Sequence, residues 1–341
     1  MILSAGYGSR LRPLTSFLPK PLIPVLNRPL LWYLIASLRR AGIHEIAINL
    51  HYRGDQIRSW LGSGSNLGVQ VTYSEETALL GSAGGVRRLR HFFGDEPAVI
   101  IHGDLLFDVD LAEVIQYHQL RDAQATIVLH PAHHRYRYGM IKINALGEIA
   151  QFVDHHAPWI SGPLIETVFT GVQILEPAVL DAIPVGSAAM LTTEVYPHLL
   201  RSAGRFYGYL MHGYWSDLGT PVRYWEANMD LVSGRLALVA TPQSDTMLQG
   251  QSFSTGVGEM PLQVGAAVRR QGDSAIGPEV VIGEGCMLEG RVWIAHSVLW
   301  PRVRLGNGVT IERSIITSDV TIPAGSHVVG KIVTSSEMAE L

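Results

Sequence analysis

The sequence predicts an α/β fold in which a mostly parallel sheet with helices on both faces precedes a short parallel β-helix. Three observations support this fold class. Strand-like and helix-like segments alternate as far as Asp104, a glycine-rich basic loop follows the first apolar run, and aliphatic residues recur at every sixth position from Ile276. Because 341 residues exceed the roughly 250 to 300 at which one core stops growing, we expect a first domain over 1–233, a connection over 234–273 and a second domain over 274–333.

Composition and charge exclude several classes of protein. Hydrophobic residues make up 47% and charged residues 16%, as in globular domains. The net charge of −4 and the pI near 6.4 argue against a nucleic-acid binder. A single cysteine, Cys286, leaves no disulfide framework or cysteine-rich zinc site and favours a reducing compartment, by default the cytoplasm. The densest apolar segment, 30–38, is too short for a bilayer, so no membrane span or export signal is expected.

The first element is a short apolar run that breaks at once into a glycine-containing loop. This loop carries Arg10, Arg12 and Lys20, and no acidic residue precedes Glu45. Glycines let the backbone approach a ligand closely, and concentrated positive charge neutralises an anion. The loop therefore predicts a bound polyphosphate.

Alternating elements follow the loop. Leu31, Leu34 and Leu38 recur at helical spacing, and Gly42 lies just beyond the last turn, so a helix is expected there. The next segments read as a strand (44–50), a short helix (55–64), a strand (69–74), a helix (83–93) and a buried strand (98–104). This order requires crossover connections and hence a parallel sheet, whose ligands sit at the carboxyl ends of the strands. The opening loop and Asp104 both lie at such ends.

The later segments are less regular. Two strands joined at 145–147, a strand over 168–175, a strand that enters a turn at Asp217 and a helix over about 220–233 are expected. From Ile276 the six-residue period predicts about three to four coils of β-helix; an antiparallel hairpin array with glycine turns is the alternative. Open coil ends and flat apolar faces predict a homo-oligomer joined through this C-terminal domain.

The stretch "SAGYGSRLRPLTSFLPKPLIPV" resembles the signature of the sugar nucleotidyltransferases, the sugar-1-phosphate pyrophosphorylases. The similarity continues through "LLGSAGGV", "HGDLLFD", "FTGVQIL" and "GYWSDLGTP", and the hexad domain occurs in members that are similar to mannose-1-phosphate guanylyltransferase. The resemblance implies a Rossmann-like nucleotidyltransferase domain and a left-handed β-helix. It also implies Mg²⁺ and a reaction in which an NTP and a sugar-1-phosphate give an NDP-sugar and pyrophosphate.

The resemblance also implies roles for individual residues. Arg10, Lys20 and Asp104 would be catalytic, and Asp104 and Asp217 would hold the metal; a helix cap and an Asx turn are their structural alternatives. The nucleotide-binding residues would be Leu3, Ala5, Gly6, Gly8, Ser9, Gly81, Ser82, Ala83 and Gly84. The sugar-phosphate-binding residues would be Gly139, Asp154, His155, Thr170 and Gly171.

Three departures from the family pattern matter. Asp154 and His155 stand where many members have a lysine that meets the sugar phosphate. A histidine (His155 or His156) replaces that lysine, or a cation from the neighbouring segment (Arg135, Arg137 or Lys142) does, or the sugar differs. Ala78 and Leu79 replace a Glu-Pro pair, which leaves base selectivity open, and the chain starts almost inside its first motif.

Several functions remain open at this point. GTP with mannose-1-phosphate is the favoured substrate pair, and the alternative is uridylyl or thymidylyl transfer to glucose-1-phosphate or an amino-sugar phosphate. A regulatory homologue without turnover would explain the missing lysine. Hexad β-helices also occur in acyltransferases, for which His296 or His327 would be the base.

Overall fold

Two units make up the chain in a computed structural model that describes residues 1–131, 139–202, 204–234, 262–272 and 274–341. The sheet unit comprises Met1–Tyr7 and Tyr33–Asp217, and the coil unit comprises Gly8–Trp32 and Leu218–Leu341. The basic loop is therefore part of the coil unit, although it follows the first strand of the sheet. In the described residues, no helix has both the length and the apolar character needed to cross a membrane.

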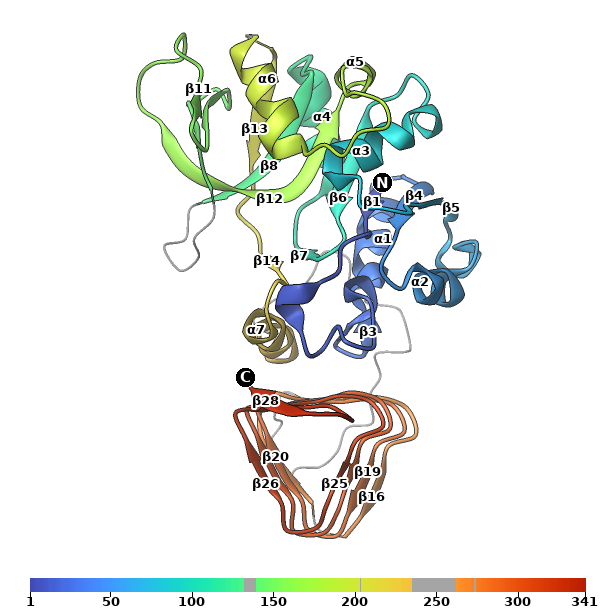
Figure 1. Ribbon diagram of the computed structural model, residues 1–341. Coiled ribbons are helices and arrows are strands. Elements are labelled where there is room, and N and C mark those ends of the chain that lie inside the picture. The colour runs from blue at the N-terminus through green and yellow to red at the C-terminus, as the bar shows by residue number, and fades with distance from the viewer. Residues whose placement is uncertain (132–138, 203, 235–261, 273) are drawn as a thin grey trace. The chain divides into compact units, whose positions relative to one another are not determined.

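The first half of the sheet unit is parallel (Figure 1). β1 (Ile2–Leu3) lies between β4 (Glu45–Leu50) and β6 (Ala98–His102), and β5 (Gln70–Glu75) extends the sheet beyond β4. The connections contain α1 (Leu30–Arg40), α2 (Gly54–Leu61) and α3 (Gly81–Arg88). Their bounds confirm the helices and strands predicted from periodicity in this part of the chain.

The second half of the sheet unit is largely antiparallel. β12 (Ile165–Leu175) pairs with β6, with β8 (Ala125–Pro131) and with β9 (Met140–Ile143). β10 (Ile149–Phe152) and β11 (His155–His156) extend the sheet from β9, whereas β13 (Phe206–Leu210) pairs with β8 in parallel. The remaining elements are β7 (Leu105–Phe107), α4 (Leu111–Leu120), α5 (Pro177–Asp181), η5 (Leu191–Val195), α6 (Tyr196–Arg201), β14 (Trp215–Asp217) and the short turns η3 (Ser65–Leu67) and η4 (Arg90–Phe92).

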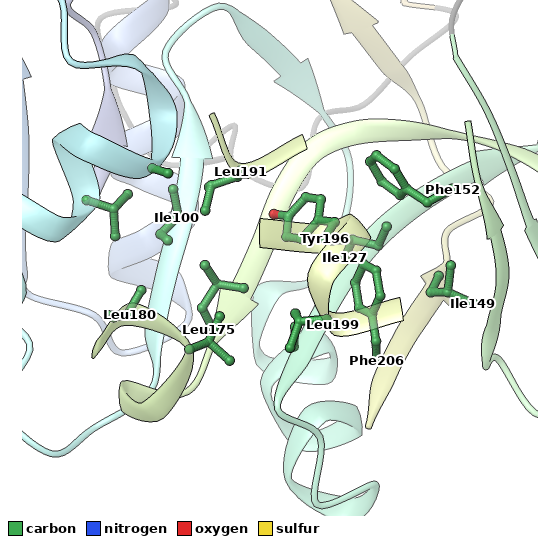
Figure 2. Packing of buried hydrophobic residues seen from close by; sticks show 14 of the residues in the cluster. Ile100, Ile127, Ile149, Phe152, Leu175, Leu180, Leu191, Tyr196, Leu199 and Phe206 are labelled. Carbon is green, nitrogen blue, oxygen red and sulfur yellow. The ribbon is translucent and has the colours of Figure 1, made fainter. Parts of the chain in front are cut away.

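One face of this sheet packs against α3, α5 and α6. Ile100 and Ile127 contribute from central strands, and Leu180 and Leu199 from helices, to one buried cluster (Figure 2). Tyr196 lies beside Phe152 and Phe206, with ring centroids 5.2 Å from each (Figure 2). Its hydroxyl donates a hydrogen bond to Gln173 Oε1, which satisfies a buried polar group in the core.

The coil unit joins the basic loop to the β-helix. The loop contains η1 (Ser9–Leu11), η2 (Lys20–Leu22) and the paired strands β2 (Pro24–Val25) and β3 (Arg28–Pro29). α7 (Pro221–Val232) packs against it: Leu26 N donates to Asn228 Oδ1 at 3.0 Å, and Tyr224 Oη donates to Pro24 O at 2.5 Å. Tyr224 Oη in turn accepts a hydrogen bond of 2.8 Å from Trp300 Nε1 of the β-helix.

The β-helix has three parallel sheets, one for each side of the triangle that its coils trace in Figure 1. Leu262 pairs with Val280 and Val281 pairs with Val298, so a coil takes 18 or 17 residues, three units of about six. Ile276, Ile282 and Leu288 lie on three successive sides and are buried. The parallel pairing confirms the β-helix over the hairpin array; its handedness stays a prediction.

The strands of the β-helix cover a longer range than the predicted second domain. They are β15 (Leu262–Val264), β16 (Arg269–Gln271), β17 (Ala275–Ile276), β18 (Val280–Ile282), β19 (Met287–Glu289), β20 (Trp293–Ala295), β21 (Val298–Leu299), β22 (Arg304–Leu305), β23 (Thr310–Glu312), β24 (Ile315–Ile316), β25 (Thr321–Ile322), β26 (His327–Val329), β27 (Lys331–Val333) and the antiparallel β28 (Met338–Glu340). Among the described residues, the first strand of the coils therefore starts at Leu262. Most of the predicted connection, 235–261 and residue 273, lies outside the described residues.

Candidate active site

A buried polar chain links the carboxyl ends of β1, β4 and β5. Ser4 N donates to Asn49 Oδ1 at 2.8 Å, and Asn49 Nδ2 donates to Glu76 Oε1 at 2.8 Å. The other carboxylate oxygen of Glu76 accepts a hydrogen bond of 3.0 Å from Leu80 N. Because Asn49 is 3% and Glu76 is 5% exposed, these bonds replace water and hold the residue after β1 in register with the segment before α3.

The start of α3 needs small residues because other backbone lies against it. A Cβ on Gly81 would collide with the Ala189 carbonyl, and one on Gly84 would lie 2.7 Å from Ser187 O. The N–H groups of Ala83 and Gly84 donate to Ala189 O at 2.9 and 3.2 Å. Ser82 Oγ accepts a hydrogen bond of 2.9 Å from Leu191 N. These contacts account for the small residues through packing, and the nucleotide-binding role of this segment stays a prediction.

Asp104 and Asp217 are brought to one end of a two-stranded ribbon. Asp104 follows β6 and precedes β7, and β14 pairs antiparallel with β7 so that Asp217 lies opposite Leu105. Opposite residues in such a pair have Cα atoms about 4.5 to 5.5 Å apart. Asp217, expected in a turn, therefore ends a strand, and tertiary pairing brings together two aspartates that are 113 positions apart.

Glycine at position 103 sets the path of the chain into Asp104. Gly103 N donates to Leu3 O at 2.8 Å, and a Cβ there would lie 2.6 Å from that oxygen and 2.7 Å from Ser4 Oγ. Only glycine permits this approach. The end of β6 is thereby held against the end of β1, next to the polar chain of Ser4 and Asn49.

A bulge in β12 positions β14. Gly171 has φ of +91°, and a Cβ there would lie 3.0 Å from Leu105 Cδ1. Thr170 Oγ1 donates to Val128 O at 2.8 Å, and Thr170 O accepts a hydrogen bond of 2.9 Å from Trp215 Nε1. The hydroxyl of Thr170 is thus bonded to the backbone, and the bulge holds the strand that ends at Asp217.

The predicted sugar-phosphate residues lie on β12 and on or beside the strands β9, β10 and β11 that extend the sheet from it. A Cβ on Gly139 would lie 2.9 Å from Val153 Cγ2, so Gly139 is beside the turn that carries Asp154 and His155. Met140, next to Gly139, pairs with Val168 of β12. This register places Gly139 near Thr170 and Gly171 of β12.

The structure describes some of the residues that could replace the lysine of the family at the sugar phosphate. Lys142 Nζ forms an ion pair of 3.0 Å with Glu166 Oε1, its register partner on β12. Arg135 and Arg137 lie outside the described residues. His155 is half-buried and His156 is exposed in β11, so both rings lie on the described surface near Gly139.

In the coil unit the basic loop folds back on itself at Gly8. Gly8 has φ of +63°, its carbonyl accepts a hydrogen bond of 2.8 Å from Thr15 Oγ1, and a Cβ there would lie 3.3 Å from Lys20 Cβ. Lys20 is 8% exposed, whereas Arg10 is exposed. The structure thus places Lys20 beside the glycine turn. Ser9 of this loop is exposed, and of the predicted nucleotide-binding residues that precede it in the sheet unit, Leu3 is half-buried, Ala5 is buried and Gly6 is exposed.

The donor set suits a hard divalent cation. In the ranges that the structure describes, no group of three or more His, Cys, Asp and Glu side chains is placed to hold a metal. Mg²⁺ is bound in many enzymes by one or two carboxylates and the phosphates of its substrate, with water completing the octahedron. Two aspartates at the carboxyl edge of the sheet fit that pattern and do not form an all-protein site.

Comparison with known proteins defines the family. The sequence model of the nucleotidyl transferase family matches residues 1–234. The chain belongs to this family. This nucleotidyl transferase is 32% identical to a UTP–glucose-1-phosphate uridylyltransferase of Synechocystis, over 92% of the chain and 87% of that protein. It is 30% identical to a mannose-1-phosphate guanylyltransferase of Mycobacterium tuberculosis, over 92% of the chain and 82% of that protein.

Solved structures agree with the sequence relatives. A Bacillus anthracis protein named as a glucose-1-phosphate thymidylyltransferase, in complex with a sucrose, has a TM-score of 0.56 and 25% identity to this nucleotidyl transferase. The match covers 67% of the chain and 92% of that protein. The similarity of fold therefore extends over most of the nucleotidyl transferase.

Sequence reasoning missed Asn49 and Glu76 as members of the site. Asn49 lies near the carboxyl end of β4, and Glu76 directly follows β5. Asn49 is a polar residue in an otherwise apolar strand, and this pattern could have indicated its role from the sequence. Their importance comes from burial, because each would be an ordinary surface residue if water reached it.

Proposed function

We propose that this nucleotidyl transferase transfers a nucleoside monophosphate from an NTP to a sugar-1-phosphate and releases pyrophosphate. The pairing of β7 with β14, which brings Asp104 and Asp217 together at the carboxyl edge of β6, is the observation that supports it best. A bond forms between a sugar-phosphate oxygen and the α-phosphorus, and the bond from that phosphorus to pyrophosphate breaks. No nucleophile from the protein is required, so the chain must orient two anions and neutralise charge.

We assign roles to the chain's own groups accordingly. Asp104 and Asp217 hold Mg²⁺, which supplies positive charge to the reacting phosphates when it is bound. Arg10 and Lys20 bind the triphosphate, and Lys20 stabilises the charge that develops on the leaving pyrophosphate. The segment from Gly81 to Gly84 positions the nucleotide. His155, or the cation of a neighbouring segment, meets the phosphate of the sugar.

GTP and mannose-1-phosphate are the substrates that we propose first. The hexad β-helix and the 30% identity to a mannose-1-phosphate guanylyltransferase over most of both chains support this pair. UTP and glucose-1-phosphate are the second candidate, because the uridylyltransferase is 32% identical over a similar share. Ala78 and Leu79 replace the family's Glu-Pro pair, so base selectivity stays open between these two candidates.

Pyrophosphate release measured for four NTPs against mannose-1-phosphate, glucose-1-phosphate and N-acetylglucosamine-1-phosphate, with Mg²⁺, tests the reaction and the substrates together. We expect one pair to exceed the others by at least about tenfold in kcat/KM, since a site built for one base leaves its polar groups unpaired with another. Absence of turnover with every pair would instead support a regulatory homologue. We further propose a cytoplasmic homo-oligomer that forms through the C-terminal coils.

A further inference from the structure

A cavity of about 680 Å³ extends along α3, from Leu80 and Gly84 at its start to its last turn. Arg87 and Arg88 of α3, Arg90 and His91 of η4, and Asp181 of α5 line it. α3 starts at the carboxyl edge and runs back along the sheet to β6, so its last turn reaches the other edge. β12 is antiparallel to β6, so α5, which follows β12, starts at that same edge.

The arginines of this cavity are only partly satisfied. Arg87 Nη1 donates to Asp181 Oδ1 at 2.7 Å, and Arg90 donates from Nε and Nη2 to Oδ1 and Oδ2 at 3.1 and 3.0 Å. These bonds, with Arg90 contributing most and Arg87 next, hold the pKa of Asp181 below its usual range, so its carboxylate stays ionised at neutral pH. Both of its oxygens are then occupied.

Three donor groups remain around the cavity. Arg87 Nε is buried and has no hydrogen-bond partner. The side chains of Arg88 and His91 are exposed and make no hydrogen bond or ion pair with the described residues. A buried N–H group without a partner is unfavourable, and a ligand oxygen at this position would satisfy it.

The charge and size of the cavity indicate the class of ligand. Three guanidinium groups face the two carboxylates of Asp95 and Asp181, so the lining has an excess of one positive charge before His91 is counted. Arginine binds phosphate through paired, charge-assisted hydrogen bonds. The volume falls within the range of about 300 to 1,000 Å³ that is typical of small-molecule sites.

One wall of the cavity is connected to the start of α3. Gly186 and Ser187 line the cavity, and Ala189, two residues on, donates from its N–H to Leu80 O at 2.9 Å and accepts from Ala83 N. Ser187 O is in close contact with Gly84. A ligand that shifts this wall would therefore shift the segment to which we assign the nucleotide.

We propose that this cavity is an effector site for a small metabolite that carries a phosphate monoester, and that its occupation changes the affinity for the NTP. The effect on affinity depends on the proposed function, whereas binding at Arg88 and His91 does not. The two are therefore measured separately.

Isothermal titration calorimetry of the full chain with inorganic phosphate, glucose 6-phosphate and AMP tests the site. The three probes show whether it prefers free phosphate, a sugar phosphate or a nucleotide. We expect at least one probe to bind, and the double variant Arg88→Gln/His91→Gln to weaken binding by about tenfold or more, since two charge-assisted hydrogen bonds are lost. Arg201→Gln, an exposed arginine of α6, is the matched control and should bind as the parent does.

Equal affinity in the double variant and the parent would show that the probe binds elsewhere and would overturn the proposal. The absence of binding by all three probes would overturn it as well. The probes are tested up to about 10 mM, so that a site with a millimolar dissociation constant is detected. Thermal unfolding checks that the variants are folded. With an active NTP and sugar-1-phosphate pair, the probe that binds should change the KM for the NTP at least about twofold in the parent and not in the double variant.

Discussion

Glu76 illustrates how one buried residue organises the carboxyl edge of the sheet. Its two oxygens accept hydrogen bonds from Asn49 and from the backbone of Leu80, and Asn49 in turn holds Ser4. A carboxylate in this position orients the segments on either side of it without touching the reacting atoms. Glu76 therefore positions the segment to which we assign the nucleotide.

Glu76→Ala should lower the free energy of unfolding by about 2 to 4 kcal/mol, because it leaves the Asn49 amide and the Leu80 N–H buried without partners. Urea denaturation measures the change. Its neighbour Glu75 is exposed and paired with Arg58, so Glu75→Ala is a matched control and should cost less than about 1 kcal/mol. Equal losses in both variants would contradict the role assigned to Glu76.

Asp104→Asn and Asp217→Asn should each reduce kcat by at least about 100-fold, because the amide removes one negative charge from the proposed metal site. Pyrophosphate release over a range of Mg²⁺ concentrations measures this loss, and unfolding midpoints should stay close to that of the parent. Asp55→Asn, at an exposed carboxylate of α2, is the control. Near-normal turnover in either variant would remove that aspartate from the metal site.

At the scale of elements, α7 joins the basic loop to the β-helix. Tyr224 is fully buried on α7, and its hydroxyl bonds to Pro24 O of β2 and to Trp300 Nε1 of the coils. Asn228, one turn further on, accepts a hydrogen bond from Leu26 N. Within this unit, the segment that follows Lys20 is held by two groups of α7 that lie 200 and 202 residues away in the sequence.

Tyr224→Phe should lower the free energy of unfolding of the coil unit by about 2 to 3 kcal/mol, since Pro24 O and Trp300 Nε1 lose their partner in a buried place. The change is measured by denaturant unfolding followed through tryptophan fluorescence. Tyr207→Phe, at a tyrosine whose hydroxyl makes no hydrogen bond to the described residues, should change stability by less than about 0.5 kcal/mol. A loss of similar size in both variants would contradict the proposed link.

At the scale of the whole molecule, one side of the β-helix carries exposed apolar side chains. Trp293 on β20 is 39% exposed and Val329 on β26 is 51% exposed, and both strands belong to the same parallel sheet. Flat sheets with exposed apolar groups are commonly covered by a second copy. This side is our candidate for the interface of the proposed homo-oligomer.

Sedimentation velocity at micromolar concentration should show a dimer or a larger assembly for the parent chain, and Trp293→Glu should shift it towards monomer by placing a charge in the apolar contact. Trp60→Glu, at a tryptophan of α2 that is exposed to a similar degree, should not change the assembly. A monomeric parent would refute the oligomer, and an unchanged assembly in Trp293→Glu would move the interface to another surface.

The local elements were predictable because their signals are local. Helical spacing predicted α1, and the six-residue period predicted the coils, since Ile276, Ile282 and Leu288 repeat one environment on successive sides. The motif residues Arg10, Lys20, Asp104 and Asp217 could be named from the sequence through their resemblance to a family pattern. No spacing could show that Asp217 would end a strand opposite Leu105, because that pairing depends on β12 and its bulge at Gly171.

The sequence by itself determined the class of fold and the period of the coils, because both follow from patterns among residues that are close in the chain. The charged residues of the motifs could also be read directly from the sequence. Only the tertiary structure decided that Glu76 is buried among donors, that the basic loop belongs with the coils, and that Arg87, Arg90 and Asp181 enclose a cavity. Those outcomes depend on which distant segments exclude water from one another, and the desolvation of a polar group is a property of its surroundings in the folded chain.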